Sequence, residues 1–176
     1  MSEIRQLYKW SLLLSLLCCG FAQAQFLPNN TQLNPQSVQR WMDSNRDFAP
    51  LVQALDAMHA TEADLKGFDS LPAATQDQKI DQFLQQKKLL ATANSIAAKR
   101  GWKSIGEYMR LGSTLGNAIA AYFLADSMAN LNAEQKLLLR EKADPAVLAV
   151  PAADISFVKA NEKLLQQYMQ AYSQGR

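Results

Sequence analysis

Residues that could do chemistry are few in this chain of 176 residues. His59 is the single histidine, which excludes multi-histidine zinc sites and the paired Glu-x-x-His motifs of di-iron bundles. His59 and Glu62, three residues apart, could share a metal weakly, but this spacing is common, and we interpret His59 as an ordinary surface or helix-end histidine. Ser156 and Lys159 have the Ser-x-x-Lys spacing of penicillin-binding enzymes, but Ser-Asp-Asn and Lys-Thr-Gly are both missing. We therefore expect no catalytic residues, no metal and no cofactor, although a carboxylate pair for glycoside cleavage stays open.

A basic cluster surrounds Trp102 and offers binding rather than catalysis. It consists of Lys99, Arg100 and Lys103, and Tyr108 follows within two helical turns. In an exported protein these cations would suit lipid headgroups or cell-wall polymers. The alternative is that the cations stabilise the negative end of a helix while the indole covers the core. We expect an apolar groove between helices, flanked by the two aromatic residues.

Small residues recur every four positions at Gly112, Gly116 and Ala120, which places them on one strip of a helix. Each glycine inside a helix costs about 1 kcal/mol relative to alanine, so a contact should compensate. Three interpretations are open: close packing inside a bundle, a dimer surface, or a small apolar ligand beside the glycines. The surrounding residues 111–126 are too few and too polar to cross a membrane.

The N-terminus has the three parts of a secretory signal peptide. Arg5 and Lys9 precede an apolar run over residues 10–22, and small residues follow. This run is shorter than the ~20 residues of a membrane-spanning helix. We expect cleavage between Ala24 and Gln25 and a periplasmic or secreted product.

Composition narrows the class of the exported chain. Cys18 and Cys19 are the only cysteines, and both would leave with the signal peptide, so no disulfide is expected. The formal net charge is +2 for the full chain, and loss of Glu3, Arg5 and Lys9 with the signal peptide leaves +1, which gives no electrostatic argument for nucleic acid. We expect a signal peptide at 1–24, a flexible polar lead at 25–34 and one helical bundle domain at 35–173.

Helical periodicity begins directly after the lead. Asn34 can cap a helix whose first residue is Pro35. Pro50 predicts a kink or short break, with Asp47 available to cap the second piece. Residues 61–74 read as a connection with at most one helical turn.

Capping-box spacings predict the next two helices. Thr75 and Gln78 would open a helix that ends at Gly101, where glycine suits a left-handed cap. Ser104 and Glu107 would open the helix that contains the small-residue strip.

Two more helices complete the expected domain. Asn132 and Gln135 would open one helix, which Asp144 and Pro145 would close, and Asp154 would open the last. No segment shows the alternation of a strand. The sequence therefore predicts an all-α bundle of five or six helices.

Two resemblances bear on this interpretation. Residues 131–135, LNAEQ, resemble one copy of the Leu-Thr-x-x-Gln motif of Spy-type periplasmic chaperones, but Asn132 replaces the threonine and no second copy follows, so we do not assign that family. Residues 37–51, SVQRWMDSNRDFAPL, and 99–122, KRGWKSIGEYMRLGSTLGNAIAAY, are similar to small uncharacterised exported helical proteins of Gram-negative bacteria. The second resemblance implies export and a helical fold, and it brings no activity.

We therefore expect a non-enzymatic binding or chaperone-like interaction module. Its partner would be another protein held at Trp102, Tyr108 and the basic cluster. The alternative is a carrier of a small apolar or amphipathic ligand inside the bundle beside Gly112 and Gly116. A dimer would use the same small-residue strip.

Overall fold

The computed structural model describes residues 33–58 and 61–173, and this part of the chain contains nine helices and no strand. The all-α class is confirmed, but the predicted number of five or six helices is too low. The proposed signal peptide and most of the polar lead lie outside the described residues. The helices are α2 Pro35–Asp56, α3 Glu62–Asp69, α4 Ala73–Gln86, α5 Leu90–Arg100, α6 Ile105–Met128, α7 Ala133–Lys142, α8 Pro145–Leu148, α9 Ala152–Ala160 and α10 Glu162–Ser173.

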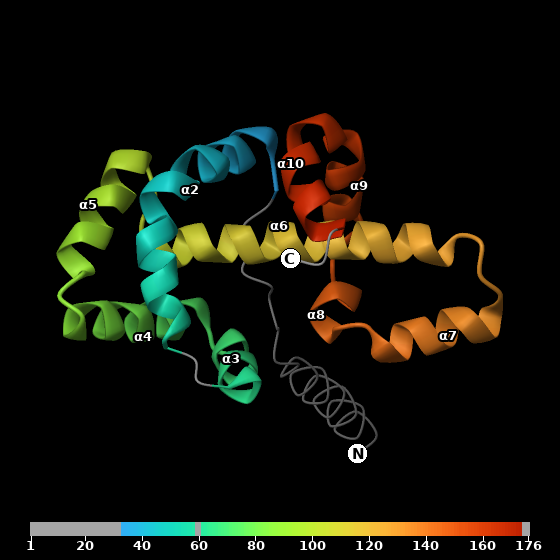
Figure 1. The fold of residues 1–176 in the computed structure, drawn as a ribbon, viewed down its shortest axis with the longest axis horizontal. Coiled ribbons are helices and arrows are strands. Elements are labelled where there is room, and N and C mark those ends of the chain that lie inside the picture. The colour runs from blue at the N-terminus through green and yellow to red at the C-terminus, as the bar shows by residue number, and fades with distance from the viewer. Residues whose placement is uncertain (1–32, 59–60, 174–176) are drawn as a thin grey trace, which may run out of the picture. The chain divides into compact units, whose positions relative to one another are not determined.

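Helix α6 is the central element of the fold (Figure 1). Helices α2, α4 and α5 contact it and one another, and α8, α9 and α10 also contact it. Figure 1 shows the first group along the N-terminal half of α6 and α8 and α9 along its C-terminal half. One long helix therefore joins two groups of shorter helices.

Helix α2 begins as predicted. The Ser37 N–H donates to Asn34 Oδ1 at 2.8 Å, and the Asn34 N–H donates back to Ser37 Oγ at 3.3 Å. The helix then continues through Pro50, and Figure 1 shows that it changes direction along its length. The prediction that Asp47 caps a second piece is wrong, because Asp47 lies inside the helix and pairs with Arg100.

The connection predicted at 61–74 is more helical than expected. It holds α3, of eight residues, and the start of α4 directly after Pro72. Thr75 therefore lies inside α4 and does not cap it. Gln76 Nε2 donates to the Phe68 carbonyl at 3.2 Å, which satisfies an acceptor near the end of α3.

The single helix predicted up to Gly101 is in fact two helices, α4 and α5. Both end in the same Schellman geometry, in which one residue is left-handed and the next N–H donates five residues back. At the end of α5 these residues are Gly101, with φ 73°, and Trp102. At the end of α4 they are Lys88, with φ 59°, and Leu89, whose N–H donates at 2.7 Å. The break between α4 and α5 was not predicted from the sequence, because Lys88 occupies the left-handed position at which glycine is usual.

The predicted starts of α6 and α7 are confirmed. Ser104 Oγ accepts from the Glu107 N–H at 3.0 Å, while the Glu107 carboxylate accepts from the Lys103 N–H, one residue before the cap. Asn132 and Gln135 form the complete reciprocal pair, with distances of 2.9 and 3.1 Å.

The C-terminal region contains more breaks than predicted. Helix α7 ends at Lys142, before Asp144 as expected, but Asp144 also caps the short helix α8. Helix α9 begins after Pro151, so Asp154 lies in its first turn rather than at its cap. Asn161 separates α9 from α10, and its Nδ2 donates to the Phe157 carbonyl at 2.8 Å.

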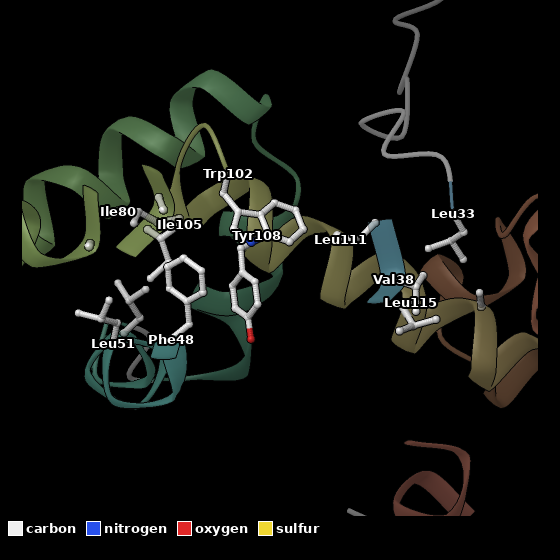
Figure 2. Close-up of a cluster of buried hydrophobic side chains, with 14 of the residues drawn as sticks. Leu33, Val38, Phe48, Leu51, Ile80, Trp102, Ile105, Tyr108, Leu111 and Leu115 are labelled. Atoms are coloured by element: carbon white, nitrogen blue, oxygen red, sulfur yellow. The ribbon is translucent and has the colours of Figure 1, made fainter. Parts of the chain in front are cut away.

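The buried core follows α6 from Ile105 to Ala121, and Figure 2 shows part of it, from Ile105 to Leu115. Leu33, assigned above to the polar lead, is 5% exposed and belongs to this core. Within the described residues, no helix is long and apolar enough to cross a membrane, as expected for 111–126. The largest fully buried apolar side chains are Phe48, Leu84, Ile105, Leu111, Leu115, Leu165, Val38 and Val158.

Candidate functional site

Trp102 and Tyr108 lie in the core rather than on an open surface. Their exposed fractions are 4% and 6%, and the two rings meet edge to face with centroids 5.7 Å apart. Figure 2 shows them among the other buried side chains. Neither side chain is among the residues that line the two hollows described below, so the open groove predicted at this pair is not where the structure has one.

The Tyr108 side chain is fixed by rings and by a hydrogen-bond chain. Its ring stacks on Phe48 at 4.3 Å and on Trp41 at 5.9 Å. Its hydroxyl donates to Asn45 Oδ1 at 2.6 Å, and Asn45 Nδ2 donates to the Tyr168 hydroxyl at 2.6 Å. Burial, with a smaller effect of Tyr168, raises the pKa of Tyr108 to about 12. A neutral, satisfied phenol of this kind is a structural group.

Trp102 is held equally firmly by α2. Its Nε1 donates to Ser44 Oγ at 2.9 Å, and Ser44 Oγ donates to the Arg40 carbonyl at 2.7 Å. The Arg40 guanidinium lies over the indole, 4.0 Å from the ring centroid, and its Nη1 donates to the Gly101 carbonyl at 2.8 Å. Arg40 and Ser44 therefore lock the start of α6 against α2.

The small-residue strip is not uniform. A Cβ at Gly112 would lie 2.9 Å from Trp41 Nε1, so the close-packing interpretation is confirmed at this residue. A Cβ at Gly116 would meet nothing within 4 Å. Ala120 is 9% exposed. The contact with the Trp41 ring therefore requires a glycine at 112, whereas Gly116 has room for a side chain.

The basic cluster divides into two parts. Lys99 and Arg100 line an open cleft, whereas Lys103 is exposed and is not among the lining residues. Arg100 Nε contacts Asp47 Oδ2 at 2.6 Å, and this hydrogen bond holds the pKa of the Asp47 carboxyl below its usual range. This pair also ties α5 to α2.

We refer to this hollow as the α2–α5–α10 cleft, because its residues come from these three helices. Its volume is about 640 Å³, within the range of small-ligand sites. Sequence reasoning missed Arg40 and Leu164, which are far from the basic cluster in the chain. The sequence feature that could have indicated Arg40 is its position next to Trp41 in the first predicted helix. The lining residues are Pro35, Gln36, Gln39, Arg40, Asp43, Ser44, Lys99, Arg100 and Leu164.

The cleft carries an excess of positive charge. Three cations line it, and Asp43 is the single carboxylate among the lining residues. Arg100 is neutralised by Asp47, but in the described part of the chain neither Arg40 nor Lys99 takes part in an ion pair. Arg40 Nε is also buried without a hydrogen-bond partner. The arrangement can therefore attract an anion.

A second, smaller hollow lies between α6 and α10. Its volume is about 390 Å³, and its charges, from Glu162 and Lys163, balance. The Tyr122 hydroxyl donates to Glu162 Oε1 at 2.5 Å beside it. This hollow therefore lacks the charge excess of the α2–α5–α10 cleft. It is lined by Phe123, Glu162, Lys163, Gln166, Met169 and Gln170.

Among the described side chains, no group of three histidine, cysteine or acidic residues is arranged to hold a metal ion. His59 and the side chain of Glu62 lie outside the described residues. In the comparisons with known proteins, no protein-family model, no curated protein and no solved structure matches the chain.

Proposed function

We propose that this protein is an exported, non-enzymatic binding module that holds its partner in the α2–α5–α10 cleft. It acts in the periplasm or outside the cell after cleavage between Ala24 and Gln25. The observation that carries the proposal is the open cleft of about 640 Å³, which is lined by two cations from different helices, Arg40 and Lys99, neither of which forms an ion pair in the described chain.

The walls of this cleft are fixed before a partner arrives. Arg40 bonds to the Gly101 carbonyl, and Ser44 accepts from Trp102, so the α2 wall is tied to the turn after α5. The Arg100–Asp47 pair makes a further link between the same two helices. A preformed wall costs little ordering free energy when a partner binds. In this proposal the buried aromatic residues support the site and do not touch the partner.

The test is occlusion of the cleft. Gln36 is exposed and lines it, so Gln36→Trp fills the space while leaving the core intact. Gln53→Trp is the matched control, because Gln53 is exposed on the same helix and is not a lining residue. Native mass spectrometry of gently purified protein should show a bound species in the wild type and the control, and none in Gln36→Trp. A bound species that persists in Gln36→Trp contradicts the proposal.

A second candidate is the carrier of a small apolar or amphipathic ligand. The observation in its favour is the open space beside Gly116, where a Cβ meets nothing within 4 Å. Gly116→Leu separates the two functions. A carrier would lose its ligand in this variant, whereas a partner bound in the α2–α5–α10 cleft would remain.

A further inference from the structure

We propose that Arg40 and Lys99 bind a phosphate group of the partner in the α2–α5–α10 cleft. This inference rests on the proposed function, because it assigns a ligand chemistry to the same cleft. The phosphate could belong to a soluble phosphate ester or to a lipid headgroup, and both present the same tetrahedral anion.

Arg40 is a preorganised donor. Its guanidinium carbon lies 4.0 Å from the centroid of the Trp102 ring, and the Gly101 carbonyl accepts from its Nη1 at 2.8 Å. Its Nε is buried and cannot reach an anion in the cleft, so the spare donors are those of Nη2, and in the described residues no carboxylate pairs with the guanidinium. Guanidinium groups with spare N–H donors in a fixed plane are suited to anions with several oxygens.

Lys99 supplies the second charge from another helix. It is exposed in the last turn of α5, lines the cleft and has no ion pair within the described chain. The adjacent Arg100 is already engaged by Asp47. The lysine on α5 therefore adds a point charge on a flexible stem to the planar guanidinium that α2 supplies to the same cleft.

The shape of the site favours phosphate over carboxylate. A carboxylate has two coplanar oxygens, which suit a single guanidinium fork, whereas a phosphate has oxygens that reach donors on two helices. Gln36 lines the same cleft and can add a neutral donor, whereas the Gln39 amide donates to Asp43 Oδ1 at 2.9 Å. Leu164 lines it too and provides an apolar surface for the rest of the ligand.

The experiment is a titration of the purified exported chain with defined probes. Inorganic phosphate and glycerol 3-phosphate are followed by NMR chemical shifts, with acetate at equal ionic strength as the competing anion. Cosedimentation with phosphatidylcholine vesicles, with and without phosphatidylglycerol, tests the lipid source. The variants are Lys99→Gln and Arg40→Lys. The matched control is Lys103→Gln, which removes an exposed cation of the same cluster that does not line the cleft.

The wild type should bind a phosphate probe more tightly than acetate. Loss of a charge-assisted hydrogen bond in Lys99→Gln should weaken binding about tenfold. Arg40→Lys keeps the charge but loses the planar fork, so it should also weaken binding, and Lys103→Gln should match the wild type. Binding of the soluble probes alone identifies a free phosphate ester, and binding of phosphatidylglycerol vesicles alone identifies a lipid headgroup.

Three results would overturn the inference: no phosphate probe binds, acetate binds equally well, or Lys103→Gln weakens binding as much as Lys99→Gln. Its failure is distinguishable from failure of the proposed function. If the phosphate probes fail while Gln36→Trp still removes the native partner, the cleft binds a different chemistry. If Lys99→Gln weakens binding of the phosphate probes while the native partner stays bound in Gln36→Trp, the proposed function fails instead.

Discussion

The helices of two regions of this chain are stabilised in different ways. The first is the aromatic centre, which we define as Trp41, Asn45, Phe48, Trp102 and Tyr108. Its rings pack on one another, and its phenol, amide and one indole N–H have partners. The second is the arm, residues 133–148, which comprises α7 and α8 and contains no buried residue.

The difference shows that a helix can have a complete capping motif in its sequence and still bury none of its side chains in the folded domain. Helix α7 has a complete capping box, yet Leu137 is 58% exposed and Leu138 is 50% exposed. Short helices in water gain most of their stability from tertiary packing. The arm should therefore open locally at a much lower free energy than the aromatic centre.

Truncation of one apolar side chain in each region should give the largest contrast. Phe48→Ala removes a fully buried ring and should lower the free energy of unfolding by about 3–5 kcal/mol. Leu137→Ala removes an exposed side chain and should change it by less than about 0.5 kcal/mol. Urea denaturation followed by circular dichroism measures both. Equal effects would show that Leu137 and α7 pack on the domain.

Gly112 and Gly116 provide a second contrast, within the single helix α6. Gly112→Ala forces a Cβ against the Trp41 ring and should destabilise the protein by about 1–3 kcal/mol. Gly116→Ala has room and should stabilise it by up to about 1 kcal/mol through helix propensity. Thermal unfolding of the two variants should therefore shift in opposite directions. Shifts of the same sign would argue against the close contact at Gly112.

The buried phenol makes the stability of the centre depend on alkaline pH. The pKa of Tyr108 is about 12 in the fold, against 10.0 for an ordinary tyrosine, so the unfolded chain loses its proton first. The free energy of unfolding should be independent of this group below about pH 10 and should fall as pH rises towards 12. Tyr108→Phe should reduce this slope. Part of the slope should remain, because burial also raises the pKa of Tyr168.

The smallest expected effect is on the arm. Asn132→Ala removes the cap of α7 and should cost about 1 kcal/mol of local helix stability. Amide hydrogen exchange should accelerate in α7 while exchange in α6 stays unchanged. Faster exchange in both helices would mean that the arm unfolds together with the rest of the domain.

Sequence reasoning worked where a structure depends on neighbouring residues. Asn34, Ser104 and Asn132 cap helices as predicted, because each cap needs only the backbone three residues ahead. It failed at Lys88, which adopts a left-handed conformation without being glycine. It also failed at Asn161, where no proline or glycine marks the break.

The site was harder to predict because it depends on distant residues. Lys99 and Arg100 were found from their clustering, but Arg40 and Leu164 reach the same cleft from helices far along the chain. Trp102 and Tyr108 were assigned to an open groove, since a sequence shows that aromatic residues are present and not how deeply they lie. The polar partners of these two buried rings, Ser44 and Asn45, lie 58 and 63 residues earlier in the chain.

The most direct test of the central claim compares the α2–α5–α10 cleft with the arm in cells that express the protein. A photo-crosslinking amino acid is placed at Gln36, on the cleft, or at Leu137, on the arm. Our account predicts that the Gln36 probe forms an adduct with the partner and that the Leu137 probe does not. An adduct from Leu137 alone would show that binding occurs on the exposed arm and would contradict the account.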